Sequence, residues 1–228
     1  MHINLIPNIH KEGYMFIIIS FFLSCAGFSI SCGLGMIFLF VTLLCIYFFR
    51  DPIRAVPQNN RYVVSPGDGT ILKIKQVSSP IDQSTVTCIS IFLNALNVHV
   101  NRIPVSGTII SKEYKPGRFI SATFDKSSEE NERQRLVIKS TVNDHVVIVE
   151  QIAGLIARRI ICNVQENQEV LLGERFGIIK FGSRVNLYLP SDITILVTEG
   201  QTVIGGETII ADLEKELSTP HNTTFKHI

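Results

Sequence analysis

The sequence has no charged residue between Gly13 and Phe49, although charged side chains stand at both edges of this run. As one helix the run would be about 55 Å long, whereas a bilayer's hydrocarbon core is roughly 30 Å thick and needs about 20 residues. This length excludes a single straight span and favours two short helices, over 14–28 and 34–49. Small residues from Gly27 to Gly35 suit a turn between them. We therefore expect a helical hairpin that enters or crosses a membrane, with both ends on one face.

The basic residues outside this run favour the cytoplasmic face of the cell (inner) membrane. They are Lys11, Arg50, Arg54 and Arg61, and each would gain roughly 1 kcal/mol near anionic lipid. A cleaved signal peptide is the alternative, but its apolar part is typically about 7–15 residues. The run here is much longer, so we expect an anchor that is retained.

The sequence also lacks the cysteine spacing of a disulfide framework or a zinc site. Its five cysteines include no CxxC and no Cys/His pattern, so no metal is expected. Buried thiols in a reducing cytosol explain them more simply. The formal net charge of +1 gives no reason to expect nucleic acid as a partner.

After Arg54 the pattern changes to short apolar runs separated by Gly, Pro, Asn and Asp, which is typical of an all-β domain. At 228 residues the chain has room for one globular domain and an appendage. We predict a mainly β, barrel-sandwich-like domain over 55–228, preceded by the membrane-associated hairpin of 1–54. The strands are predicted over 62–64, 70–74, 86–92, 107–110, 135–140, 146–150, 160–162, 177–180, 185–189 and 195–197.

One internal repeat is present: Val164–Glu174 reappears as Val197–Glu207. Each copy reads as a strand, a tight turn, an apolar pair and a glycine turn. The pattern resembles the hairpin units of lipoyl- and biotinyl-carrier β-sandwiches, which interlock about a pseudo-twofold axis. Neither copy has a carrier-type lysine at its turn, so the repeat predicts architecture and not a carrier function.

The Gly182–Ser183 pair lies between two predicted strands, and by itself it would be read as a turn. Its surroundings change that interpretation. The segments Arg175–Gly177, Gly182–Arg184 and Tyr188–Pro190 resemble the processing site of phosphatidylserine decarboxylase proenzymes of the short form. Asn186 departs from that pattern, which has an acid at this position.

Further segments match the same family in the same order over nearly the whole chain. They are Tyr47–Pro52, Val64–Gly69, Asn97–Pro104, Lys115–Phe119, Asn131–Arg133 and Gln151–Arg159.

The resemblance implies that Ser183 attacks the carbonyl of Gly182, where no side chain obstructs the approach. The amide becomes an ester, and β-elimination releases the upstream segment and leaves dehydroalanine at residue 183. Water then hydrolyses the dehydroalanine to a covalent pyruvoyl group, with loss of its nitrogen as ammonia. The products would be a β chain, 1–182, and an α chain, 183–228. The pyruvoyl cofactor would form a Schiff base with the amine of phosphatidylserine and take up electrons as CO2 leaves, which gives phosphatidylethanolamine.

The resemblance also suggests roles for two ionisable residues. His99 is the expected acid or base, because histidine ordinarily titrates near neutral pH, and Asp68 is expected to orient or activate the base during self-cleavage. Long-form relatives carry a second histidine where this chain has Arg102. Either His99 therefore serves both steps, or His145, preceded by Asp144, contributes.

Arg102, Arg118 and Arg133 are candidates for holding the phosphate or carboxylate of the substrate. The alternative for each of these arginines is a surface charge without a function.

Two other functions compete with this one. A membrane-tethered lipoyl-like adaptor would need no catalysis, but such adaptors usually carry coiled-coil arms and no heptad run is present. A pyruvoyl decarboxylase acting on another, soluble amine would gain little from a membrane hairpin. The expected partners are thus a phospholipid in the membrane and the two chains of one proenzyme, while the sequence leaves homo-oligomerisation open.

Overall fold

The computed structural model describes residues 8–117, 131–154, 159–180, 183–214 and 225–227. The chain divides into two compact units, Met1–Ile53 and Arg54–Ile228.

The first unit is a pair of antiparallel helices. It consists of β1 (Asn8–Ile9), the 3-10 turn η1 (Lys11–Gly13), α1 (Tyr14–Ile30), α2 (Cys32–Phe48) and β2 (Arg50–Asp51). Ser31 separates the helices because its backbone is extended, and its side chain accepts a hydrogen bond from the N–H of Leu34 at 3.2 Å. The predicted helix pair is confirmed, with a tighter connection than the expected turn.

Small residues allow the two helices to approach closely. The Ser24 hydroxyl donates to the carbonyl of Gly35 at 2.9 Å. A Cβ on Gly27 would lie 3.0 Å from the Gly35 nitrogen, and one on Gly35 would lie 2.3 Å from the ring of Phe28. Glycine is therefore required at this contact, as in close helix packing generally.

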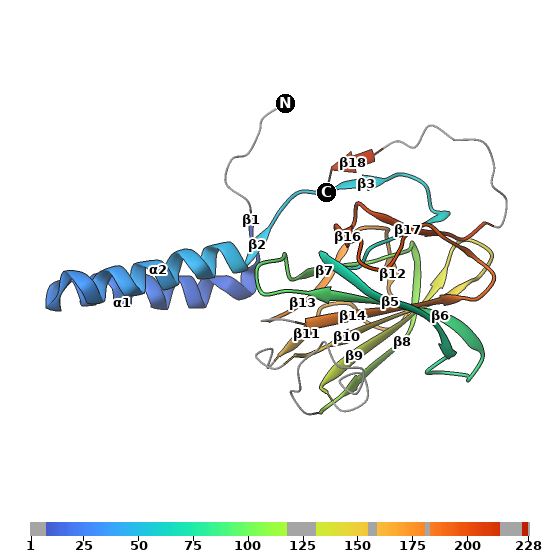
Figure 1. Cartoon of the computed structure of the whole chain (residues 1–228), viewed down its shortest axis with the longest axis horizontal. Helices are drawn as coiled ribbons and strands as arrows, with labels where there is room; N and C mark the ends of the chain where they lie inside the picture. The colour runs from blue at the N-terminus through green and yellow to red at the C-terminus, as the bar shows by residue number, and fades with distance from the viewer. Residues whose placement is uncertain (1–7, 118–130, 155–158, 181–182, 215–224, 228) are drawn as a thin grey trace. The chain divides into compact units, whose positions relative to one another are not determined.

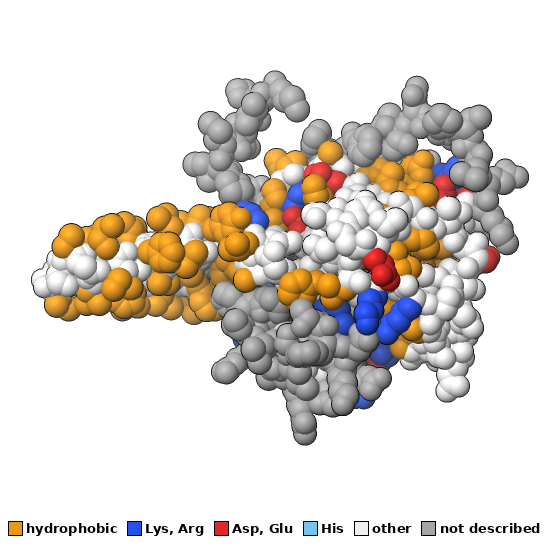
Figure 2. Space-filling model, in the orientation of Figure 1, with side chains coloured by type: hydrophobic (Ala, Val, Ile, Leu, Met, Phe, Trp, Pro, Cys, Tyr) orange, Lys and Arg blue, Asp and Glu red, His pale blue; other side chains and the backbone are white. Residues whose placement is uncertain are grey.

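The outer surface of the helix pair is apolar (Figure 2). The segment Lys11–Ile30 is long and apolar enough to cross a membrane, whereas Cys32–Phe48 is apolar but shorter.

All regular secondary structure in the described part of the second unit is strand, so the predicted mainly β class is confirmed. Its strands are β3 (Ala55–Pro57), β4 (Tyr62–Val64), β5 (Gly69–Ser78), β6 (Thr85–Leu93), β7 (Val100–Arg102), β8 (Gly107–Lys115), β9 (Arg133–Ser140), β10 (Val146–Ile152), β11 (Ile160–Cys162), β12 (Glu169–Val170), β13 (Arg175–Ile179), β14 (Ser183–Pro190), β15 (Thr194–Ile195), β16 (Thr202–Val203), β17 (Ile209–Asp212) and β18 (Phe225–His227).

The largest sheet is antiparallel and has the order β12-β8-β9-β10-β14-β6-β5-β16 (Figure 1). Strand β14 lies inside this sheet, between β10 and β6. Alternate residues of β14, namely Val185, Leu187 and Leu189, pack in the main hydrophobic core. The residues between them face the other side of the sheet, where Tyr188 packs in a second, smaller cluster.

The smaller sheets have the orders β11-β13-β7, β15-β17-β4 and β18-β3. In the first of these, β13 pairs with both neighbours, so the segment that leads to Ser183 is held against the segment that follows His99.

The two copies of the sequence repeat make equivalent contacts. In the first copy, β12 pairs with the start of β8, and the Asn167 N–H donates to the carbonyl of Ile109 at 2.7 Å. In the second, β16 pairs with the start of β5, and the Gly200 N–H donates to the carbonyl of Ile71 at 2.8 Å. Asn167 and Gly200 both have positive φ, 62° and 81°, so each copy turns with the same backbone geometry.

Candidate active site

Ser183 is the first residue of β14 and pairs with Leu93, the last residue of β6. It lies two residues before Val185, so its side chain faces the core side of the sheet. The side chain is fully buried, and its hydroxyl has no hydrogen-bond partner among the described residues. A buried hydroxyl without a partner costs about 1–3 kcal/mol and calls for a chemical explanation. The preceding residue, Gly182, lies outside the described residues.

His99 lies at the same end of the sheet. Its carbonyl accepts a hydrogen bond from the N–H of Ile179 at 3.3 Å, which places it beside the segment leading to Ser183. A short loop also connects it to the end of β6, where Leu93 pairs with Ser183.

The tautomer of His99 follows from one contact. Its Nδ1 lies 2.9 Å from the carbonyl oxygen of Asn97, and a carbonyl can only accept. Nδ1 therefore carries the hydrogen, and in the neutral ring Nε2 is the basic nitrogen. A fully buried imidazole fixed in this tautomer can take a proton at Nε2.

Asp68 is held in place by two hydrogen bonds. Its Oδ2 accepts from Arg54 Nη2 at 2.7 Å and its Oδ1 from the N–H of Gly205 at 2.8 Å. Within the described part of the chain, its oxygens bond to these groups and to no histidine. Each oxygen retains a second lone pair, so the carboxylate can accept a further hydrogen.

The loop that carries Asp68 lies against the strands of the site. A Cβ on Gly67 would lie 3.0 Å from Asn101 Nδ2 and 3.3 Å from a methyl group of Leu93. Leu93 is the residue that pairs with Ser183, so the segment Val64–Gly69, which contains Asp68, meets the start of β14 at this end of the sheet.

Two further predicted motifs converge here. The Asn131 side chain donates to the carbonyl of Ala153 at 2.7 Å, and the Ala153 N–H donates to the carbonyl of Glu132 at 2.9 Å. Ala153 follows Ile152, which pairs with Arg184. The Asn131–Arg133 and Gln151–Arg159 motifs are therefore joined beside the start of β14.

The three candidate arginines have different surroundings. Arg102 is buried and donates to the carbonyl of Gly173 at 2.9 Å. Arg133 pairs with Ile152 at the Ser183 end of the sheet, and its Nε lies 3.9 Å from Glu150. Arg118 lies outside the described residues.

His145 lies at the opposite end of β10. It precedes Val146, whereas the Ser183 end of this strand is Ile152, and seven residues of strand span about 20 Å. The structure thus does not bring His145 to Ser183. Its turn contains Asn143 and Asp144, which have φ of 50° and 54°.

Two buried amides near the site, Asn101 and Gln151, were given no role by the sequence motifs. Gln151 Nε2 donates to Asn101 Oδ1 at 2.7 Å. A usable signal was present: Asn101 stands two residues after His99, and residues at that spacing on a strand share a face.

The far side of the sheet carries a separate polar network around Glu150. This residue pairs across the strands with Asn186 and accepts from the Tyr188 hydroxyl at 3.0 Å and from Arg135 at 2.9 Å. Burial raises the pKa of Tyr188, and burial raises the pKa of Cys88 to about 11. The family pattern has an acid at the position of Asn186. Because Glu150 pairs with Asn186, it places a carboxylate directly opposite that position.

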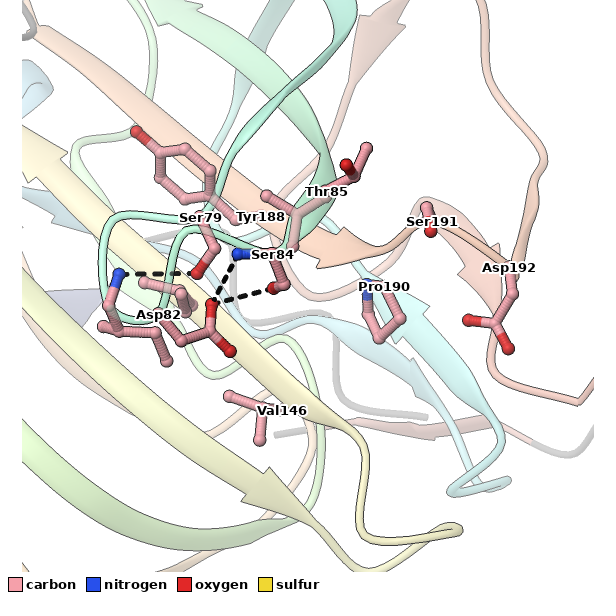
Figure 3. A pocket seen from close by; sticks show the side chains of 12 residues that line it. Ser79, Asp82, Ser84, Thr85, Val146, Tyr188, Pro190, Ser191 and Asp192 are labelled. Carbon is pink, nitrogen blue, oxygen red and sulfur yellow. Dashed lines mark hydrogen bonds between the residues drawn. The ribbon is translucent and has the colours of Figure 1, made fainter.

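A cavity of about 190 Å³ lies at the other end of β14 (Figure 3). It is lined by hydroxyls and carboxylates, among them Ser84, Asp82 and Asp192. Hydrogen bonds from Ser79 and Ser84 lower the pKa of Asp82. Ser183, His99 and Asp68 do not line this cavity, so the Ser183 end of β14 remains the candidate active site.

Comparison with known proteins identifies relatives of this chain. The family model described as phosphatidylserine decarboxylase matches residues 41–211. A phosphatidylserine decarboxylase proenzyme from Ehrlichia ruminantium (strain Welgevonden) is 71% identical over 212 residues, which cover 92% of this chain and 93% of that protein.

More distant relatives carry the same name. The proenzyme of Ehrlichia chaffeensis is 66% identical and covers 99% of both chains. The proenzyme of Rickettsia typhi is 48% identical and covers 93% of this chain and 94% of its own. The match extends over the helix pair and the β unit alike, and the chain belongs to the phosphatidylserine decarboxylase family.

Proposed function

We propose that this chain converts phosphatidylserine to phosphatidylethanolamine and CO2, using a pyruvoyl group made from its own Ser183. The observation that carries the proposal is the buried hydroxyl of Ser183, which has no hydrogen-bond partner in the described part of the chain and lies where the family motifs converge. The membership of the family supplies the substrate and the reaction.

The surroundings of residue 183 fit such a group. The side chain is enclosed, faces the core side of the sheet and makes no hydrogen bond to the described residues that its conversion would break. Once formed, the ketone supplies a carbon that can bond to the substrate's amine and an electron sink for the pair released with CO2.

Self-cleavage needs a proton to leave Ser183 and a proton to reach its backbone nitrogen. The Oγ forms a bond to the carbonyl carbon of Gly182 while the bond between that carbon and the nitrogen of Ser183 breaks. We assign the transfer to His99 Nε2, which takes the Oγ proton and returns it to the departing nitrogen. Asp68 is proposed to support this step from the adjoining loop, through the lone pairs that Arg54 and Gly205 leave available.

The two chains would stay together after the cut. Every residue of β14 has a partner on β6, and the five residues from Arg184 to Tyr188 also pair with β10. Strands β16 and β17 pair with β5 and β4 in the same way. The 183–228 chain is therefore proposed to remain part of the sheet, and Ser183 keeps its position at the strand end.

His99 is also the proposed acid that protonates the substrate carbon after CO2 leaves. For the anionic groups of the lipid we keep Arg102, Arg118 and Arg133 as candidates. Arg133 is supported by its place at the Ser183 end of β9, and Arg102 by its position on the strand that follows His99.

We propose that the helix pair anchors the enzyme in the inner membrane with the β unit on the cytoplasmic face. Each helix has 17 residues, which corresponds to about 26 Å and approaches the thickness of the hydrocarbon core. An anchor of this kind brings the enzyme to a substrate that itself resides in the bilayer.

The matched turns at Asn167 and Gly200 support a lipoyl-type arrangement of the β unit. Each turn bonds to the third residue of its partner strand, Ile109 in β8 and Ile71 in β5. We propose that this arrangement is architectural and serves to hold the site.

The function can be tested by adding borohydride to the enzyme during turnover of phosphatidylserine labelled in its serine head group. Reduction should fix the label on the 183–228 chain, and the Ser183→Ala protein should take up none. Capture on a lysine of the 1–182 chain would contradict the assignment. Turnover of a soluble amine at the same rate, without lipid, would favour the alternative substrate class.

A further inference from the structure

Besides the Ser183 hydroxyl, two more polar atoms on the core side of this sheet are buried without a partner in the described part of the chain. They are Asn101 Nδ2 and Gln151 Oε1, and both side chains are fully buried. One is a hydrogen-bond donor and the other an acceptor. Leaving both unpaired costs about 1–3 kcal/mol each, so their retention calls for an explanation.

These two amides are joined to each other by the 2.7 Å bond from Gln151 Nε2 to Asn101 Oδ1. The bond links β10 to β7 and fixes the orientation of both side chains. Each amide therefore presents its remaining polar atom in a defined direction.

The strand register places the pair beside Ser183. Gln151 pairs with Val185, which lies on the same face of β14 as Ser183 because the two are separated by one residue. Gln151 and Ser183 are thus diagonal neighbours on one face of the sheet, within reach of a long side chain.

A second path through the structure leads to the same neighbourhood. Asn101 Nδ2 and the Leu93 side chain both lie against Gly67, within 3.0 Å and 3.3 Å of the position a Cβ would occupy there. Leu93 pairs with Ser183. Each residue in this group therefore contacts or neighbours the next, and the last lies beside the first: Ser183, Leu93, Gly67, Asn101 and Gln151.

We propose that Asn101 and Gln151 form an amide pair that orients the oxygen on residue 183. In the precursor as it reacts, the Ser183 hydroxyl turns from its present position, where it has no partner among the described residues, so that Gln151 Oε1 accepts its hydrogen and Asn101 Nδ2 donates to its oxygen. This fixes the direction of the Oγ lone pair that attacks the Gly182 carbonyl. As the new bond forms, the hydroxyl hydrogen turns from Gln151 Oε1 to His99 Nε2, which takes the proton. The inference rests on the proposed function and adds two residues to its site.

A neighbouring amide shows what a purely structural role looks like. Gln134 of β9 pairs directly with Gln151 and is also buried. Its Nε2 donates to the carbonyls of Glu113 and Arg135, at 2.9 Å and 3.2 Å. Gln134 therefore serves as the matched control for Gln151.

The test measures the rate at which newly made full-length chain is cut into two, in membranes, for Gln151→Met, Asn101→Leu and Gln134→Met. The first two variants should be cut roughly tenfold to hundredfold more slowly, the penalty expected for a misaligned nucleophile. Gln134→Met should be cut within twofold of the normal rate. Thermal unfolding of all three confirms that the comparison is made on folded protein.

Hydroxylamine distinguishes orientation of the hydroxyl from a general loss of structure, because it cleaves esters and leaves amides intact. If the pair orients the attack, the slow variants should accumulate no hydroxylamine-labile bond at residue 183. Normal cutting in Gln151→Met and Asn101→Leu, or an ester that accumulates in them, would overturn the inference. Failure of the unsubstituted protein to cut itself would instead count against the proposed function.

Discussion

Polar side chains gather at both ends of β14, but their hydrogen bonding differs. At the Ser183 end, Ser183, Asn101 and Gln151 are fully buried and each keeps a polar atom without a partner among the described residues. At the Pro190 end, hydroxyls and carboxylates around Asp82 bond to one another (Figure 3). The presence of hydroxyl groups therefore does not distinguish the candidate site from the other end of the strand. The feature that distinguishes it is the burial of polar groups that lack hydrogen-bond partners among the described residues.

The two copies of the repeat offer a second comparison. Asp68 Oδ1 accepts from the Gly205 N–H at 2.8 Å, and the equivalent Ser106 hydroxyl accepts from the Leu172 N–H at 3.0 Å. A hydroxyl is thus sufficient for this turn. The carboxylate of Asp68, with its ion pair to Arg54, is what the first copy has in addition, which supports a chemical role for it.

The largest effect is expected from a serine exchange at each end of β14. Ser183→Ala should leave a single full-length chain with no decarboxylase activity, because no hydroxyl remains to attack Gly182. Ser191→Ala, at the cavity of Figure 3, should be cut and active as normal. Gel analysis and CO2 release measure both, and a normally cut Ser183→Ala chain would refute the mechanism.

A histidine exchange compares the two ends of β10. His99→Ala should lower decarboxylation by roughly 10²–10⁴-fold, the usual contribution of a general acid or base. His145→Ala should retain full turnover, since its turn lies at the far end of the strand. Turnover is measured per cut chain, so that an effect on processing is counted separately. Unchanged turnover in His99→Ala would remove this residue from the site.

Exchanging the equivalent residues of the repeat should produce smaller effects: one exchange should slow self-cleavage and the other should lower stability. Asp68→Ser keeps an acceptor for Gly205, so the fold should persist while self-cleavage slows. Ser106→Ala removes the acceptor for Leu172 and should lower the free energy of unfolding by about 1 kcal/mol with cleavage unaffected. Denaturant unfolding and the rate of cutting separate the two outcomes. Equal rates in both variants would mean that Asp68 is structural only.

The smallest effect is expected in the pH dependence of stability, through Tyr188 on the far side of the sheet. Burial raises the pKa of Tyr188, so above about pH 10, the ordinary tyrosine pKa, the unfolded chain releases a proton that the folded chain keeps. Stability should therefore fall as the pH rises through this range. In Tyr188→Phe the fall between pH 8 and pH 10.5 should be smaller. An unchanged slope in urea unfolding would contradict the assignment.

Much of the fold could be predicted because its pattern is local. Alternating apolar residues indicated β6, β9, β10 and β14, and the uncharged run indicated the helix pair. Six short strands of the β unit were not predicted, because segments of two to four residues carry little periodicity: β3, β7, β12, β16, β17 and β18. Their existence depends on pairing with distant segments.

The site was predictable to the extent that its motifs could be matched to a family. Asn101 and Gln151 were missed because an amide in a strand is ordinarily solvated, and only the tertiary structure shows them buried without full hydrogen bonding. The bonds of Asp68 to Arg54 and Gly205 likewise join segments that are far apart in the sequence.

The central claim is that a serine hydroxyl cuts its own chain and becomes the reactive ketone. The intact mass of purified, active protein tests it most directly. We predict two polypeptides, 1–182 and 183–228, the smaller lacking a free amino terminus and carrying the mass of a pyruvoyl group in place of serine. Full activity in a preparation that contains only one uncut chain would contradict the account.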